Sequence, residues 1–290
     1  MTQIIINSII SASIYLLIGI SFSIIYRICK FFHIGHAAVL TCAAYMALLL
    51  SNIKIQGILN HIIAVILCAI LGCLLEVTIF RYQRRKANSK LVLMLTSIGI
   101  FITIQNSISM IFGDETKTIR SKIVEKGNQI FGASITQTQE MIVTIGVIVF
   151  ILIYCGYKCT KIGKASKAVE SQAEIARLSG INTNQVIFWS MALGSAVAGL
   201  AGILIALDVD MTPTMGMNAL LMGIVAMIIG GVKSIPGIAL GALLLALSQN
   251  IGTWYFGAQW QDAIAFGILL VFLIFRPQGF LGKKIKKATV

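Results

Sequence analysis

Charged residues are scarce in this sequence, and their scarcity excludes most kinds of soluble protein. Only 11% of the 290 residues are Asp, Glu, Lys or Arg, against about 25% in an ordinary soluble domain. Hydrophobic residues make up 58% of the chain and gather in long, nearly uncharged runs. Such runs suit a hydrocarbon core about 30 Å thick. The composition therefore predicts a membrane protein.

Acidic residues are the rarer of the two charged classes. The chain has 10 Asp and Glu against 23 Lys and Arg, which gives a net charge of +13. In a soluble protein this excess would suggest a nucleic-acid partner. Here the basic residues lie between apolar runs, where positive charge sets the orientation of membrane spans. We therefore expect contact with the lipid bilayer and none with nucleic acid.

The sequence offers little for catalysis or for nucleotide binding. It has three histidines, no H-E-x-x-H zinc motif and no G-x-S-x-G nucleophile motif. The nearest approach to a phosphate-binding G-x-x-x-x-G-K-[ST] loop is Gly163-Lys164-Ala165, where Lys158 stands in place of the first glycine and Ala165 in place of the hydroxyl. We expect no enzymatic activity, no ATP hydrolysis and no cofactor in this chain.

The cysteines indicate neither disulfides nor a metal site. All six lie within or at the edges of apolar segments: Cys29, Cys42, Cys68, Cys73, Cys155 and Cys159. Cys155 and Cys159 are four residues apart on one expected helix, a spacing that could hold a metal, but no histidine lies near them in sequence. We interpret all six as small buried side chains.

Nine apolar segments define the expected fold. They cover approximately 4–26, 36–53, 58–80, 91–112, 141–157, 184–206, 216–232, 237–256 and 259–275. The sequence predicts an all-α polytopic membrane protein with about eight or nine transmembrane helices in a single domain, residues 1–290. The turns at 27–36 and 233–237 are short enough for re-entrant hairpins, and such a hairpin at the second turn would change the number of full spans.

The basic residues predict the orientation of these spans. If successive loops alternate between the two sides, 18 Lys and Arg lie on one side and five on the other, together with seven of the ten acids. An excess of Lys and Arg marks the cytoplasmic face. We therefore expect the N-terminus outside, the C-terminus in the cytoplasm, an extracytoplasmic loop at 113–140 and a cytoplasmic loop at 158–183.

Polar side chains within the apolar segments are candidates for function, because such groups are costly in a bilayer. Gln105 and Asn106 lie in the middle of segment 91–112, and His36 begins segment 36–53. The amides either form hydrogen bonds between helices or line a polar path. A lone histidine such as His36 is more often a structural hydrogen-bond donor than a proton carrier.

Glu76 is the one acidic residue expected inside the membrane. It lies about one turn from the cytoplasmic end of segment 58–80. From there it can reach Arg81 or Arg84, and a local ion pair is the role we expect.

Segment 184–206 carries small residues at the spacing that lets helix backbones approach closely. Gly194 and Ala198 lie on one stripe and Ser195 on the next. Helix packing is the simplest interpretation, and a contact that slides during gating is the alternative.

The loop at 158–183 contains a candidate for contact with a partner. Residues 167–179 hold no helix breaker and are followed by Gly180, which suits a helix C-terminus. The expected helix has a narrow apolar face that includes Ala173 and Ala176, and Glu170 lies outside that face. Such a helix either lies on the membrane or fits the groove of a partner protein. Its acidic residues favour the partner.

These features occur within a series of short motifs that runs through the chain. The motifs are Gly35-His36-Ala37-Ala38 with Tyr45, Ser97-Ile98-Gly99 with Gln105-Asn106, Glu170, Ala176 and Gly180-Ile181-Asn182-Thr183-Asn184, Gly199-Leu200-Ala201-Gly202, Gly230 to Gly237, and Arg276-Pro277-Gln278-Gly279. In this order they resemble the inner-membrane permease of branched-chain amino-acid ABC importers, specifically the smaller of its two permease types.

The resemblance implies a heteromeric importer in the bacterial inner membrane. Its parts would be two permeases, two cytoplasmic ATP-binding subunits and an extracytoplasmic substrate-binding protein. Residues 167–179 resemble the coupling helix that docks into the ATPase, with Glu170, Ala173, Ala176 and Gly180 as its expected contacts. We expect the substrate path between 36–53, 91–112 and 184–206.

Three alternatives remain open. Closely similar permeases carry urea or short amides, which one permease sequence cannot distinguish from amino acids. A secondary carrier should show acidic residues in mid-span and two related halves. A membrane-embedded enzyme should present several His or acidic residues at one membrane face.

Overall fold

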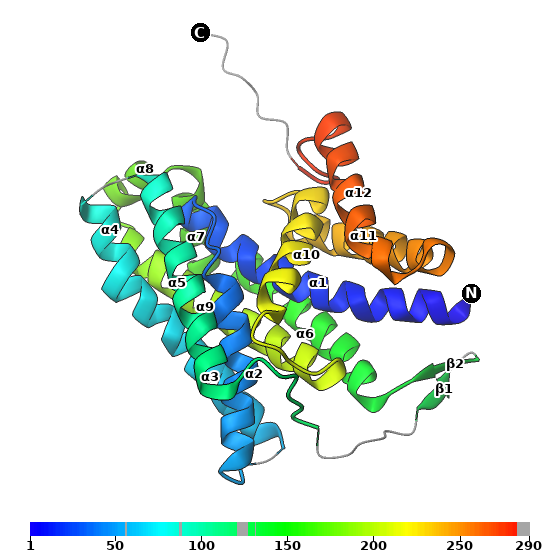
Figure 1. The fold of residues 1–290 in the computed structure, drawn as a ribbon. Helices are drawn as coiled ribbons and strands as arrows, with labels where there is room; N and C mark the ends of the chain where they lie inside the picture. Colours follow the sequence, from blue (N-terminus) through cyan, green and yellow to red (C-terminus); the bar gives the residue numbers. More distant parts are fainter. Residues whose placement is uncertain (56, 87–88, 121–126, 131, 283–290) are drawn as a thin grey trace.

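Helices make up most of the molecule. The computed structural model describes residues 1–55, 57–86, 89–120, 127–130 and 132–282, and Figure 1 follows them along the chain. In chain order the elements are α1 (Thr2–Cys29), α2 (His36–Asn52), α3 (Ile58–Leu75), the π-helix η1 (Glu76–Phe80), α4 (Arg81–Lys86), α5 (Lys90–Phe112), β1 (Asn128–Ile130), β2 (Ala133–Ile135), α6 (Gln137–Cys159), α7 (Lys161–Ser171), α8 (Ala173–Leu178), α9 (Thr183–Asp208), α10 (Met215–Gly230), α11 (Ile235–Phe256), the 3-10 helix η2 (Ala258–Trp260) and α12 (Gln261–Phe275).

The number and length of the helices agree with a polytopic membrane protein. Among the described residues, seven helices are long and apolar enough to cross a membrane: α1, α3 with η1 and α4, α5, α6, α9, α11 and η2 with α12. Two shorter apolar helices, α2 and α10, accompany them. Each of the nine predicted apolar segments coincides with one of these helices, so the prediction of a polytopic helical membrane protein is confirmed.

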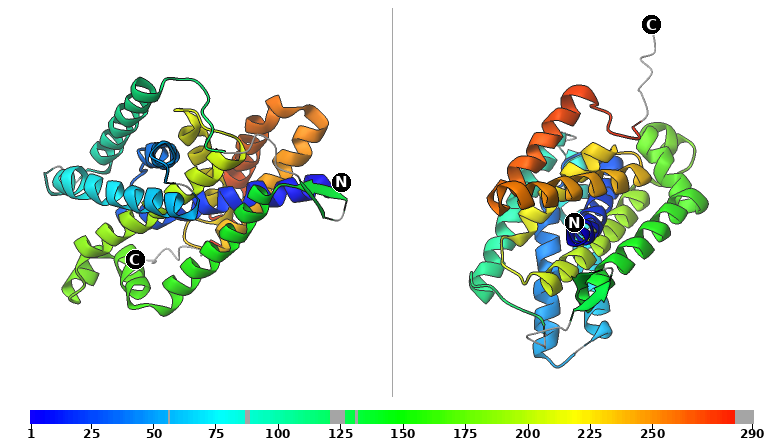
Figure 2. Two further views of the ribbon diagram at one scale, coloured as in Figure 1. Left: turned by 90° about the horizontal axis from the view of Figure 1, so that it is seen from below. Right: turned by 90° about the vertical axis from the view of Figure 1, so that its right-hand side faces the viewer.

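Helix α1 forms the centre of the bundle. It packs against α6, α9, α10 and α11, and Figure 2 shows it surrounded by them when viewed along its axis. Its buried side chains Leu17, Ile18, Ile20 and Phe22 join the largest hydrophobic cluster. The first apolar segment of the sequence is therefore the core helix of the fold.

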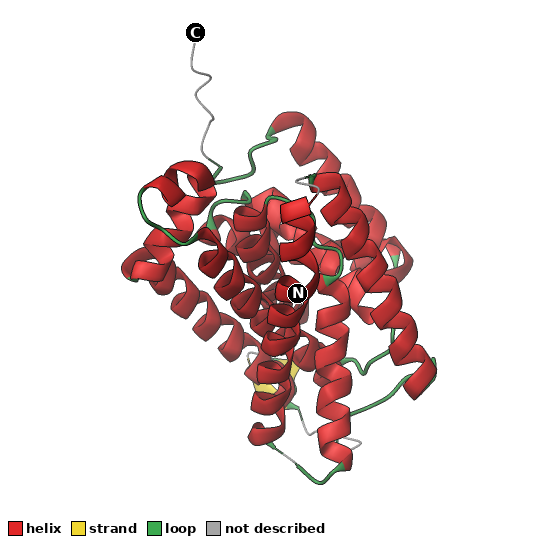
Figure 3. Cartoon of the chain, turned by 90° about the vertical axis from the view of Figure 1, so that its left-hand side faces the viewer, coloured by secondary structure: helices red, strands yellow, loops and turns green. Residues whose placement is uncertain are grey.

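A short hairpin departs from the all-α expectation. Strands β1 and β2 pair antiparallel, with Asn128 opposite Ile135, inside the predicted loop 113–140, and they are the yellow arrows in Figure 3. The Ser134 N–H donates to Gln3 Oε1 at 3.0 Å, which ties the hairpin to the start of α1. Strands of three residues are too short to show an alternating pattern in the sequence.

The next part of this face is held together by main-chain bonds and one ion pair. Lys117 and Met211 exchange two backbone hydrogen bonds of 2.9 Å, which join the loop after α5 to the loop after α9. Arg120 Nη2 lies 2.7 Å from Asp210 Oδ1. Its hydrogen bond holds the pKa of the Asp210 carboxyl below the usual range. Lys122 and Lys126 lie outside the described residues, as do the lysines after residue 282.

On the opposite face, two of the sequence motifs meet. The turn between α10 and α11 contains Gly231, with φ 101°, a backbone conformation that favours glycine. The N–H groups of Phe280 and Leu281 donate to the carbonyl oxygens of Ile229 and Gly230, at 2.9 and 3.2 Å. The segment after α12 thereby satisfies carbonyl groups at the C-terminal end of α10.

Candidate functional site

A buried polar cluster links the start of α2 to its neighbours. His36 Nε2 lies 3.0 Å from Ser21 Oγ of α1, and His33 Nδ1 lies 2.8 Å from Ser97 Oγ of α5. Ser97 Oγ also accepts the Gly35 N–H at 2.8 Å. Both histidine side chains are fully buried. These bonds fix the loop between α1 and α2 inside the protein.

Three members of this cluster were not among the predicted site residues. Ser21 and His33 carry no motif of their own, while Ser97 belongs to the Ser97-Ile98-Gly99 motif. The motif gave no indication that its hydroxyl group would face a turn more than 60 residues away. The cluster explains why a histidine stands at the start of α2: its Nε2 atom has a partner on the central helix.

The small residues of α9 lie at close helix contacts. A methyl group on Gly194 would come within 2.7 Å of Ile25 Cγ1 on α1, and one on Gly72 of α3 would overlap the Ser195 side chain. Ala198 is fully buried in the largest hydrophobic cluster. The interpretation as helix packing is confirmed for this stripe.

Gln105 and Asn106 lie apart from that core, on α5. Asn106 is exposed and donates a 2.7 Å hydrogen bond to the Ile102 carbonyl oxygen of its own helix. Thr103 and Ser107 are exposed beside it and bond their own helix in the same way. The six residues predicted for the path thus fall into two groups, with His36, Gly194, Ser195 and Ala198 in the core and the two amides on α5.

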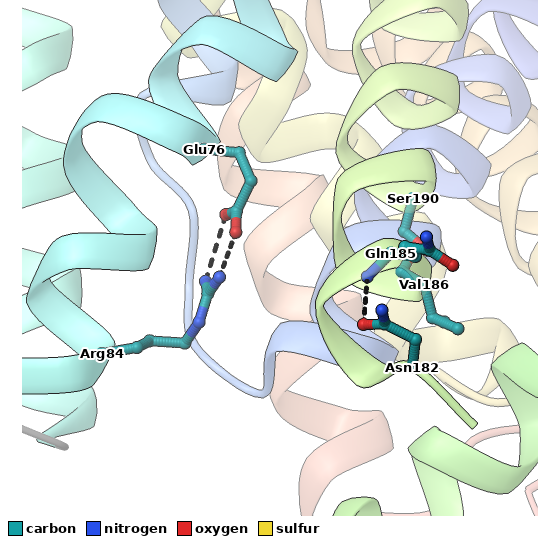
Figure 4. Close-up of polar contacts among 6 residues, drawn as sticks. All are labelled: Glu76, Arg84, Asn182, Gln185, Val186 and Ser190. Carbon is teal, nitrogen blue, oxygen red and sulfur yellow. Dashed lines mark hydrogen bonds and ion pairs between the residues drawn. The ribbon is translucent and has the colours of Figure 1, made fainter. Parts of the chain in front are cut away.

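The predicted ion pair of Glu76 is present, and its partner is Arg84. Arg84 Nη1 donates to Glu76 Oε2 at 3.1 Å, and Nη2 donates to Oε1. Figure 4 shows both bonds. Glu76 is 2% exposed, so the fork of the guanidinium compensates a buried carboxylate.

The predicted single helix over 167–179 is wrong. Helix α7 ends at Ser171 and α8 begins at Ala173, because Gln172 has an extended backbone with φ −148° and ψ 107°. Val169 and Ala176, one from each helix, pack with Ile28 and Val186 in a single hydrophobic cluster. The bend lets two short helices cover the ends of α1 and α9, which one straight helix could not do.

The two alanines of α8 that were predicted to contact a partner differ in their exposure. Ala173 is exposed, whereas Ala176 is 4% exposed. Ile175 and Leu178 carry most of the exposed apolar surface of α8, at 57% and 87% exposure. The sequence places Ile175 or Leu178 on the same apolar face as Ala173 and Ala176, whereas in the structure Ala176 is buried and both larger side chains are exposed.

Glu170 binds within the chain. Arg27 Nη2 lies 2.6 Å from Glu170 Oε2, with both side chains largely buried, and the Arg27 guanidinium also stacks over the Tyr157 ring at 5.3 Å. This pair connects the central helix α1 to α7. The carboxylate therefore holds the loop on α1 and is occupied by Arg27.

Gly180 ends α8 as predicted. Its φ is 83°. The Gly180 N–H donates to the Arg177 carbonyl oxygen at 3.1 Å, and the Ile181 N–H donates to that of Ala176 at 3.0 Å. This is the Schellman pattern, in which a left-handed residue satisfies the last carbonyl groups of a helix. The chain can then turn directly into α9.

Metal ligation finds no support in the described residues. No three His, Cys, Asp or Glu side chains within them come close enough together to hold an ion. Cys155 and Cys159, the pair with metal-compatible spacing, are both exposed on α6, so the interpretation of all six cysteines as buried side chains is wrong for these two. Cys68 is buried, and Cys29, Cys42 and Cys73 are half-buried.

Comparison with known proteins gives a consistent result over nearly the whole chain. Residues 4–273 match the family described as "Branched-chain amino acid transport system / permease component". The high-affinity branched-chain amino acid transport system permease protein BraD of Pseudomonas aeruginosa is 27% identical over 97% of this chain and 95% of its own length. LivH of Escherichia coli, of the same description, is 25% identical over 96% of this chain and 94% of its own.

A solved structure shares the fold. A chain of "PsaBC from Streptococcus pneumoniae in complex with Fab" superposes with a TM-score of 0.55 and covers 96% of this chain and 92% of its own. Its sequence is 12% identical, so this likeness concerns the fold alone.

Proposed function

The chain belongs to the family of branched-chain amino-acid transport permease components, and from this we propose that it is the membrane-spanning subunit of an ATP-driven importer for Leu, Ile and Val. It resides in the bacterial inner membrane. The observation that carries the proposal is the match to amino-acid permeases over nearly the full length of both chains. This match favours amino acids over urea or short amides.

The complex that we propose gives this chain four kinds of partner: lipid, a second permease, two ATP-binding subunits and an extracytoplasmic substrate-binding protein. The chain contributes one permease domain, residues 1–290. In this proposal ATP is hydrolysed by the separate ATP-binding subunits, because this sequence has no phosphate-binding loop. Proteoliposomes that contain the full complex should accumulate labelled leucine only when ATP is present on the ATPase side. Uptake driven by a proton or sodium gradient instead would contradict the proposal.

We infer eight or nine spans, with the N-terminus outside and the C-terminus in the cytoplasm. The support is the uneven distribution of Lys and Arg among the loops, together with the nine apolar helices. Cysteines introduced at Asn128 and Ser171, in a protein without its native cysteines, should differ in reaction with an impermeant thiol reagent on intact cells. Only the cysteine at 128 should react, and reaction at 171 alone would reverse the assignment.

We propose that the substrate path runs along α5 and the neighbouring start of α2. Thr103, Asn106 and Ser107 are exposed in the middle of an apolar helix, and polar side chains facing lipid at that depth are costly. A second permease packed against this face would cover them and leave a passage lined by hydroxyl and amide groups. Such a passage suits a zwitterion because it has no fixed charge to trap it.

The four predicted path residues that lie in the core do not line the proposed path, but they fix the helices next to it. His36 is fixed by Ser21, while Gly194, Ser195 and Ala198 allow α9 to pack closely on α1 and α3. In this proposal they set the position of α2 relative to α1, and α2 in turn packs against α5.

We propose that the cytoplasmic loop 158–183 couples ATP hydrolysis to movement of the permease. Ile175 and Leu178 of α8 offer an exposed apolar surface, and the small Ala173 lies on the same helix. Glu170, Ala176 and Gly180 fix the position of that surface through the Arg27 ion pair, the cluster with Ile28 and the helix end. A helix held rigidly on α1 and α9 can transmit a push or a pull.

Leu178→Asp tests this coupling. The variant should insert and bind substrate-binding protein normally, yet lose most substrate-stimulated ATP hydrolysis and uptake, because a carboxylate would oppose docking of an apolar surface. Leu178→Met preserves size and polarity and should retain both activities. Wild-type stimulation in the Leu178→Asp complex would leave the loop without a coupling role.

A further inference from the structure

A groove rich in arginine lies between α4 and the proposed coupling helix α8, and the proposed transport mechanism assigns no role to its arginines. It has a volume of about 780 Å³, and Arg81, Arg84 and Arg85 of α4 line one side. Arg177 of α8 and the start of α9 line the other. Figure 4 shows the Glu76–Arg84 pair on the side of its helix that faces the start of α9. Four guanidinium groups thus surround one opening.

Three of these four arginines form no ion pair within the described residues. Arg84 binds Glu76, but Arg81, Arg85 and Arg177 form no ion pair among the residues that the structure describes. The Arg81 Nε atom is buried and has no hydrogen-bond partner there. A buried N–H donor without an acceptor is costly. The groove therefore suits an anion with several acceptor oxygens.

The first turn of α9 opens into the same groove. Asn182 caps the helix by accepting the Gln185 N–H at 3.2 Å, and Thr183 and Asn184 also line the groove. The positive end of a 26-residue helix favours negative charge. Helix and guanidinium groups therefore favour the same kind of ligand, a phosphate or similar oxyanion.

The position of the groove favours a lipid as the source of that phosphate. It lies at the end of the apolar helix formed by α3, η1 and α4, which is where a span leaves the bilayer. Exposed apolar side chains occur on the helices before and after α4: Leu74 and Val77 lie on α3 and η1, and Leu91 and Leu95 lie on α5. Acyl chains can cover such residues while a headgroup lies among the arginines.

We propose that this groove binds the headgroup phosphate of an anionic phospholipid from the cytoplasmic leaflet. The choice of leaflet rests on the orientation given under the proposed function. Arg81 and Arg177, on opposite sides, hold the phosphate between α4 and α8. A bound lipid would then connect the end of α4 to the coupling loop without a protein contact.

Lipid binding to the purified permease tests the proposal. Native mass spectrometry should detect phosphatidylglycerol at lower concentrations than phosphatidylcholine. The double variant Arg81→Gln and Arg177→Gln should weaken phosphatidylglycerol binding at least about tenfold, because each cation near an anionic lipid contributes substantially. Lys161→Gln with Lys164→Gln removes the same charge from exposed positions on α7 outside the groove, and this control should bind lipid normally.

Further measurements distinguish a lipid from free phosphate and from a protein partner. Inorganic phosphate at millimolar concentration should not displace the lipid, and equal binding of phosphate alone would identify a free-anion site and overturn the proposal. Arginine variants that bind lipid normally but lose copurification with an ATPase subunit would show a protein occupant, which also overturns it. If the double variant does not fold, Arg85→Gln, at an exposed side chain, gives the same test. Lipid binding needs no transport, so its failure is distinct from failure of uptake.

Discussion

Helices α1 and α9 are buried among other helices, whereas α5 lies at the outside with polar side chains exposed. In α1 and α9, 72% and 67% of an apolar 18-residue stretch is buried, against 22% in α5. All three are apolar enough to span a membrane. The helices differ in the residues at their contacts. Small residues let the backbones of α1 and α9 come close to their neighbours, whereas α5 carries Thr103, Asn106 and Ser107 on an exposed side. Burial of a span therefore follows from small-residue spacing and not from its hydropathy.

The largest effect on stability is expected at the contact between α9 and α2. A methyl group on Gly202 would overlap the Leu40 carbonyl oxygen, and a backbone atom in a packed core cannot easily move. Gly202→Ala should therefore lower the free energy of unfolding by about 3 kcal/mol. The measurement is the melting temperature and the yield of folded permease after extraction into detergent.

Gly267→Ala is the matched control for that contact. It lies on the outer helix α12, and a methyl group there has no neighbour within 4 Å. The same chemical change should leave the melting temperature unchanged or slightly higher, since alanine favours helix more than glycine. Equal losses at both positions would remove the distinction between core and outer helices.

A smaller effect is expected where the loop between α6 and α9 is attached to the core. Glu170→Gln leaves the Arg27 guanidinium without its carboxylate in a largely buried position. We expect a loss of about 2 kcal/mol, less than for a fully enclosed pair, because Arg27 retains Tyr157. Thermal unfolding would measure it, together with proteolysis between α7 and α8. A variant as stable and as resistant as the wild type would show that the pair does not hold the loop.

Much of the fold could be predicted because it depends on local patterns. Apolar runs located all nine long or short membrane helices, and a glycine after a helical stretch located the end of α8. The pairing of Glu76 could be narrowed to two arginines because the partners lie on one continuous helix. These features need only neighbours in sequence.

Other features depend on contacts between distant segments. Gln172 has an ordinary helix propensity, and the bend there arises because Val169 and Ala176 must both reach the ends of α1 and α9. The role of Glu170 depended on Arg27, 143 residues earlier. The exposure of Asn106 depends on which spans surround α5, which its own sequence does not record.

A weak, pH-dependent effect is expected at Asp210, in the loop after α9. The Arg120 hydrogen bond lowers the pKa of this carboxyl in the folded protein. Its contribution to stability is therefore complete above the unfolded value of about 3.9 and is lost as pH falls through the lower folded value. Since both side chains are partly exposed, the contribution should be less than about 1 kcal/mol.

The comparison of melting temperatures at pH 6 and pH 3 measures this contribution. Asp210→Asn should be slightly less stable than the wild type at pH 6, and the difference should shrink at pH 3. Glu115→Gln removes an equal charge from an exposed side chain nearby and should show no such change. A difference between Asp210→Asn and the wild type that grows on acidification would contradict the assigned sign.

The smallest effect on stability is expected at Asn106, where the effect on transport should be large. Among the described residues its amide bonds only the Ile102 carbonyl oxygen of its own helix, and the side chain is exposed. Asn106→Leu should therefore change the free energy of unfolding by less than about 0.5 kcal/mol. Uptake by the assembled complex should nevertheless fall severalfold, because the proposed path loses an amide that can replace water around a zwitterion. Asn250→Leu on α11 removes an amide with the same kind of bond, to the Ala246 carbonyl oxygen, and should leave uptake unchanged. If Asn106→Leu instead lowers stability and leaves uptake intact, α5 belongs with the packed core and the path lies elsewhere.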